Sequence, residues 1–134
     1  MANYVGGDRV IVNTMQVTAG ANLVDKTFVN IDGTVPANAA KCTGGVGKGD
    51  TLSGDLATLK HGAGSQLEVI ATGTVTLGNF VEILTSTFTT KDTTGVTGAG
   101  VQDASSTNVV VGRALTAGSV NDTVLIELLH AVNV

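Results

Sequence analysis

The chain has 134 residues, of which 43% are hydrophobic and 13% are charged, and its net charge is −4. This length suffices for one domain with its own core, and the frequent Val, Ile and Leu argue against a disordered chain. The acidic balance and an aromatic content of 3% argue against a nucleic-acid partner, because phosphate is repelled and stacking surfaces are scarce.

Membrane insertion and secretion are not expected. The sequence has no apolar run of about 18 residues, so no transmembrane helix is predicted. The first residues lack a basic segment followed by an apolar one, so no signal peptide is predicted. The single cysteine, Cys42, excludes an internal disulfide framework and agrees with assembly in a reducing cytoplasm.

Apolar and β-branched runs between short polar turns predict strands along the chain. The expected strands cover residues 9–17, 26–31, 66–75, 80–88, 108–114 and 123–129. A short hairpin is expected over residues 50–59, around Ser53-Gly54-Asp55. The pairs Asp32-Gly33 and Gly78-Asn79 are expected as turns, since Asn, Asp and Gly tolerate a positive φ.

Three segments break this series of strands. Residues 43–49 (TGGVGKG) are dense in glycine and predict a bend or bulge. Residues 37–40 are compatible with a short helix, although they carry no convincing caps. Residues 89–107 form the longest polar stretch and predict an exposed β-arm or a long loop, which is often functional.

The closing strand is apolar on both faces, which indicates either a central strand or a contact between subunits. Altogether the sequence predicts an all-β fold, a small β-barrel or β-sandwich-like single domain over residues 1–134, with little helix. Within it, residues 1–10 are expected as an N-terminal arm and residues 89–107 as an extended loop.

Catalytic and phosphate-binding alternatives find little support. Cys42, His61 and His130 could form a nucleophile–base pair, but their spacing lacks any supporting context, and a buried thiol with two peripheral imidazoles is favoured. Residues 42–49 resemble a phosphate-binding loop, yet the positions that need Gly and Ser or Thr hold Cys42 and Gly49. No catalytic residue is therefore predicted, and the chain is not expected to be an enzyme.

Metal binding is weighed in the same way. Five aspartates in expected turns offer oxygen ligands for calcium, although none belongs to a run of alternating carboxylates. They are Asp50, Asp55, Asp92, Asp103 and Asp122. Aspartate that bonds its own turn is the favoured interpretation, so neither a metal nor a cofactor is predicted.

Four stretches share their motifs, in order, with one family. They are YVGGDRV at 4–10, FVNIDG at 28–33 with AAKCTGGV at 39–46, GTV at 73–75 with GNFV at 78–81, and VGRALTAG at 111–118 with DTVLIEL at 122–128. In these stretches the chain resembles the head decoration, or capsid cement, proteins of tailed phages. It departs from the family at Asn121, where the family has glycine, and over the segment between Phe88 and Asn108.

The resemblance implies a structural protein, commonly a homotrimer, on the outer surface of an icosahedral capsid. Such a protein is made in the cytoplasm of the host bacterium, binds the major capsid protein, bridges neighbouring capsomers and stabilises the head against the pressure of packaged DNA. Neither nucleic acid nor membrane is implied as a partner. The alternative is a phage fibre, spike or adhesion module that binds a host surface, and the polar segment 89–107 motivates it.

Contacts with the shell are expected from the N-terminal segment and from residues 89–107, because termini and long loops can reach across subunits. The residues expected there are Ala2, Asn3, Tyr4, Val5, Thr93, Thr94, Val96 and Val101. The closing strand is expected to form the core or the trimer contact. Its expected residues are Val124, Leu125, Ile126, Leu128 and Leu129.

Overall fold

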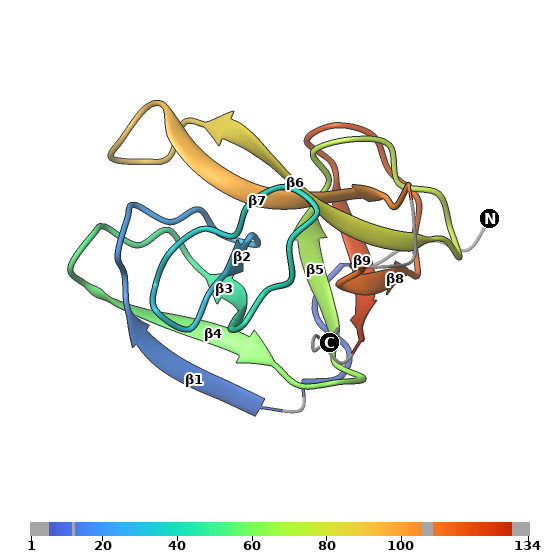
Figure 1. Cartoon of the computed structure of the whole chain (residues 1–134), viewed down its shortest axis with the longest axis horizontal. Helices are drawn as coiled ribbons and strands as arrows, with labels where there is room; N and C mark the ends of the chain where they lie inside the picture. Colours follow the sequence, from blue (N-terminus) through green and yellow to red (C-terminus); the bar gives the residue numbers. More distant parts are fainter. Residues whose placement is uncertain (1–5, 12, 106–108, 130–134) are drawn as a thin grey trace.

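The computed structural model describes residues 6–11, 13–105 and 109–129, and within these ranges it contains strands and no helix (Figure 1). The strands are β1 (Asn13–Thr18), β2 (Phe28–Val29), β3 (Gly45–Lys48), β4 (Leu56–His61), β5 (Gln66–Ile70), β6 (Phe80–Phe88), β7 (Val96–Asp103), β8 (Gly112–Ala114) and β9 (Thr123–Leu128). The prediction of a small, all-β single domain is confirmed.

The strands form one antiparallel sheet in the order β1-β4-β3-β2-β7-β6-β8-β9-β5. The sheet is not closed into a barrel, so β1 and β5 are its two edges. It is nevertheless strongly curled, because the chain just after β5 returns to the middle of the sheet. Ile70 N donates to Lys26 O over 3.0 Å, and Thr72 N donates to Val101 O over 2.9 Å.

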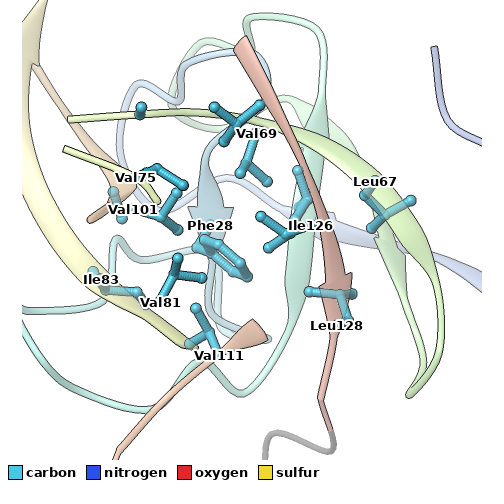
Figure 2. Close-up of a cluster of buried hydrophobic side chains, with 14 of the residues drawn as sticks. Phe28, Leu67, Val69, Val75, Val81, Ile83, Val101, Val111, Ile126 and Leu128 are labelled. Carbon is cyan, nitrogen blue, oxygen red and sulfur yellow. The ribbon is translucent and has the colours of Figure 1, made fainter. Parts of the chain in front are cut away.

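The main core lies inside this curl, and side chains from seven strands belong to it. Figure 2 shows part of this cluster. Phe28 from β2 lies in the middle of the view, between residues of β6 and β7 on one side and of β5 and β9 on the other. The labelled neighbours are Leu67, Val69, Val75, Val81, Ile83, Val101, Val111, Ile126 and Leu128. Burying each such side chain fully contributes about 1.5–3 kcal/mol, so this cluster is the main source of stability.

A second, smaller cluster lies under β1 and β4. Its buried members are Val17, Ala19, Leu23, Val29, Ala57 and Leu59. Met15 packs against it from β1 while remaining partly exposed. The inward row of β1 is therefore apolar, whereas its other side chains face solvent.

The strand predicted for residues 80–88 is confirmed with the same bounds as β6, and the closing strand is confirmed as β9. The strand predicted for residues 9–17 is displaced, since β1 begins at Asn13. The helix-compatible segment 37–40 forms a turn in which Ala39 has a positive φ of 53°. That conformation cannot continue a right-handed helix.

The glycine-rich segment 43–49 was predicted as a bend or bulge, and this is wrong over most of its length. Residues 45–48 form β3, which pairs with β2 and with β4. A Cβ atom added to Gly45 would stand 2.2 Å from the carbonyl oxygen of Lys60. Glycine is therefore needed in this strand because the backbone of a neighbouring strand approaches closely. The local sequence alone predicts an interruption between strands, since glycine is rare inside them.

The long loop predicted for residues 89–107 is also corrected, whereas its β-arm alternative agrees with the structure. Strand β7 occupies residues 96–103 and pairs with β6 in a hairpin whose register runs from Phe88↔Val96 to Val81↔Asp103. A Cβ atom added to Gly100 would stand 2.5 Å from Ile70 O. Gly100 thus lets the end of β5 cross β7, and the residues that connect β6 to β7 are 89–95.

Candidate functional site

The N-terminal segment lies along the outer edge of β5. Arg9 N donates to Gln66 O over 3.1 Å, and Gln66 N donates to Val10 O over 2.7 Å. Asp8 is tied to the same strand, because its Oδ1 accepts a hydrogen bond of 2.8 Å from Glu68 N. Residues 7–10 of the expected N-terminal arm are therefore fixed to this edge, while the expected contact residues Ala2, Asn3, Tyr4 and Val5 lie outside the described residues.

The other expected shell-contact segment is the tip of the β6–β7 hairpin, which lies at the upper left of Figure 1. Thr94 is exposed and Thr93 is half-buried in the connecting turn, which Thr90 N closes by donating to Thr93 O over 2.7 Å. Val96 and Val101 are buried in the interior of the chain, with 5% and 0% of their surface exposed. On a single chain only the two threonines of this set offer their side chains to a partner.

The closing strand β9 lies between β8 and β5 in the sheet, and residues on both of its faces are buried within the single chain. Val124, Leu125 and Ile126 are each 0% exposed, and Leu128 is 7% exposed. The two-sided apolar pattern is thus accounted for by a central strand within one chain. Leu129, just after the strand, is half-buried.

A hollow of about 380 Å³ lies beside Leu128 and Leu129. Cys42 and His61 are both among the residues that line it. The Cys42 thiol donates a hydrogen bond to Val29 O over 3.1 Å. Burial raises the pKa of this thiol to about 11 and outweighs the hydrogen bonds that lower it. The thiolate, which is the nucleophile, is therefore scarce near neutral pH, and the arrangement does not activate Cys42. His130 lies outside the described residues.

Three of the five aspartates expected in turns accept hydrogen bonds that stabilise loops. Asp50 accepts from Asp25 N over 2.8 Å, Asp103 from Thr76 N over 2.8 Å, and Asp122 from Ser119 N over 2.9 Å. Within the described ranges, no group of three or more His, Cys, Asp or Glu residues could hold a metal ion. Those ranges also hold no helix with the length and apolar character needed to span a bilayer.

Two surface features were missed by sequence reasoning. The turn at Gly78-Asn79 exposes Leu77 and Phe80, which are 60% and 42% exposed, beside Arg113, the cross-strand partner of Phe80. The outer edge of β1 carries no charged residue between Asn13 and Thr18. The uncharged run was visible in the sequence, but its position at an edge depends on the pairing order of the whole sheet.

Comparison with known proteins gives a match to a solved structure. No model of a known protein family and no curated protein sequence matches the chain. The solved structure of the head fibre gp8.5 N base of bacteriophage phi29 superposes with a TM-score of 0.62 at 16% sequence identity. The match covers 89% of this chain and 95% of that one, so the two share their fold over nearly the whole domain.

Proposed function

We propose that this chain is a structural protein of a phage head, which decorates the outside of an icosahedral capsid. It bridges neighbouring copies of the major capsid protein and stabilises the shell against the pressure of packaged DNA. The observation that carries the proposal is the fold shared with the phi29 head fibre base over 95% of that domain. The resemblance of four ordered stretches of the sequence to the capsid cement proteins supports the same assignment.

The surface supports binding through many weak contacts. Large apolar side chains are exposed at separate places, and a protein with 13% charged residues loses little free energy by desolvating such a surface. The exposed set is Val10, Ile11, Ile31, Leu52, Leu56, Leu77, Phe80 and Val120. Contacts repeated around a symmetric shell add through avidity, so no single deep pocket is required.

The proposed partners are the major capsid protein and further copies of this chain, as a homotrimer. The proposed shell contacts are the N-terminal segment and the tip of the β6–β7 hairpin around Thr93 and Thr94. The net charge of −4 disfavours contact with the packaged genome, which agrees with a place on the outer surface of the virion. The chain is proposed to be made in the cytoplasm of the host bacterium and to join the shell there.

The test is to add the purified, labelled chain to expanded capsids that lack it, and to follow its uptake by co-sedimentation and cryo-EM. We expect saturable uptake at symmetry-related positions and a higher temperature of shell disruption. Capsids that are already decorated serve as the control and should take up none. Absence of uptake by the undecorated shell would refute the decoration role.

The alternative role is the base of a head fibre or of an adhesion module, and the match to a head fibre base favours it specifically. A fibre base would bind the capsid without stabilising it, and particles that carry it would adsorb better to host cells. Comparing decorated with undecorated particles in both assays separates the two roles. Improved adsorption with an unchanged disruption temperature would favour the fibre, and the opposite result would favour cement.

A further inference from the structure

The two edges of the sheet are treated differently by the fold. At the β5 edge, residues 7–10 cover the strand and place the carboxylate of Asp8 beside it. A covered, charged edge is a common way of preventing pairing with other chains. At the β1 edge, no such cover exists among the described residues.

The backbone groups that β1 presents follow from its pairing with β4. Ala19 N donates to Asp55 O over 2.8 Å, one position beyond the last residue pair of the two strands, so the backbone of Ala19 faces β4. Hydrogen-bonding groups alternate in direction along an antiparallel strand, so those of Met15 face β4 as well. Those of Thr14 and Gln16 therefore point away from the sheet.

Around Thr14 and Gln16 this edge has none of the usual protection. Among the residues that the structure describes, none bonds the outward N–H or C=O groups of Thr14 and Gln16. The strand Asn13–Thr18 carries no charge and no proline, which are the common means of blocking an edge. Within the described ranges, only at the C-terminal end of β1 does another segment cover the edge, because Gly33 lies against the carbonyl oxygen of Thr18.

The residues of β1 suit pairing with themselves. We propose that β1 pairs antiparallel with β1 of a second copy of this chain, about a two-fold axis at Met15. This register places Thr14 opposite Gln16 of the second copy, which satisfies four outward N–H groups and four outward C=O groups with four hydrogen bonds. Met15 lies opposite Met15 of the second copy, and the apolar row beneath β1 continues across the axis.

The charge distribution favours a second copy as the occupant of this edge. Each chain carries a net charge of −4, so most surfaces of two copies repel one another. The edge of β1 is uncharged, and the proposed register brings no like charges together. The contact is isologous, so it is additional to the proposed trimer. A single chain doubles its mass by this contact, and each chain of a trimer contributes one such edge.

The first experiment measures mass against concentration by sedimentation for the intact chain, Gln16→Pro and Gln16→Ala. Proline removes an outward N–H group without removing a bond to β4, whereas alanine keeps that group. We expect the mass to rise with concentration for the intact chain and for Gln16→Ala, by a doubling where the basic unit is one chain. For Gln16→Pro we expect association weaker by about 30-fold, because two hydrogen bonds are lost across the axis. Circular dichroism checks that all three proteins are folded.

The second experiment tests the register by exchanging charges. A chain with Thr14→Lys and Gln16→Lys should not pair with itself, because lysines face one another across the axis, and the same holds for Thr14→Glu with Gln16→Glu. An equimolar mixture of the two should associate as a mixed pair, with an affinity that falls as salt is added. A mixture that remains at the mass of the basic unit would overturn the proposed register.

The self-pairing proposal is overturned if the mass of the intact chain stays constant up to its highest soluble concentration. If Gln16→Pro then also loses uptake by the undecorated capsid, the edge pairs with a strand of the shell protein instead. Uptake of the intact chain by capsids is measured separately from its mass. Failure of the decoration role is therefore distinguishable from failure of self-pairing.

Discussion

Gly33 lies directly against Thr18: a Cβ atom on Gly33 would stand 2.0 Å from the carbonyl oxygen of Thr18. The φ of Gly33 is +84°, a conformation that costs other residues about 1–2 kcal/mol. Gly33→Ala should therefore lower the free energy of unfolding by roughly 2–4 kcal/mol, because the steric clash adds to the conformational cost. Equilibrium unfolding in urea measures this loss.

Gly54→Ala is the matched control for that change. Gly54 has a similar φ of +92°, but no atom lies within 4 Å of the position of an added Cβ. The expected loss is only the conformational cost of about 1–2 kcal/mol. Equal losses for the two variants would show that the contact with Thr18 does not constrain this turn.

Ile126→Asp should unfold the chain. Ile126 is 0% exposed in the main core, and an unpaired carboxylate there should cost more than about 4 kcal/mol. Val120→Asp makes a comparable apolar-to-acid change at a side chain that is 56% exposed, and should alter stability by less than about 0.5 kcal/mol. Thermal melting followed by circular dichroism separates the two. If Ile126→Asp remained folded and only its oligomeric mass fell, β9 would instead be a subunit contact.

The burial of Cys42 makes stability depend on pH in the alkaline range. Its pKa is raised from 9.0 to about 11 in the folded chain, so below about pH 9 the thiol is protonated in both states. Between pH 9 and 11 the unfolded chain loses this proton and the folded chain keeps it, so stability falls as pH rises. Two pKa units correspond to about 2–3 kcal/mol.

Urea unfolding at several pH values tests this, with Cys42→Ala as the control, because that variant lacks the ionising group. The difference in stability between the two proteins should change only above about pH 9. A thiol reagent at pH 8 should also modify the chain only after unfolding. Rapid modification of the folded protein would show that the hollow beside His61 exposes an ionised thiol.

The strands that could be predicted are those whose own residues favour β structure, without help from contacts with distant segments. Residues 80–88 are β-prone, follow the turn at Gly78-Asn79, and form β6 as expected. Residues 45–48 were missed because glycine weakens the local strand signal. Their conformation is fixed by the backbone of Lys60 on a neighbouring strand. Such a contact lies between segments that are distant in sequence, so no local pattern contains it.

The candidate surfaces were only partly predictable for the same reason. The apolar pattern of β9 was compatible with a central strand or with a subunit contact, and only the order of the sheet shows that β8 and β5 enclose it. The uncharged pattern of β1 was equally visible. This pattern matters only because β1 is an edge strand. That position is known from the sheet order, in which β4 is, among the described residues, the one strand that pairs with β1.

Asp8 holds the N-terminal segment against β5, so removing its carboxylate should release that segment. Asp8 Oδ1 accepts a hydrogen bond from Glu68 N, and its other oxygen forms an ion pair with Lys60. The side chains of Lys60 and Asp8 are only 20% and 13% exposed, so solvent screens the pair incompletely. Asp8→Ala should lower stability by about 2 kcal/mol, since hydrogen bonds to charged groups contribute about 1.5–3 kcal/mol.

Hydrogen exchange locates that effect, because the amides of Gln66 and Glu68 should exchange faster once the segment no longer covers them. Asp92→Ala is the control, since Asp92 lies exposed in the turn between β6 and β7 and the change should leave both amides protected. A released β5 edge would also offer a second strand for pairing. Asp8→Ala should therefore associate further at high concentration, even in a chain that also carries Gln16→Pro. Unchanged exchange in Asp8→Ala would show that the backbone bonds of Arg9 and Val10 suffice to cover β5.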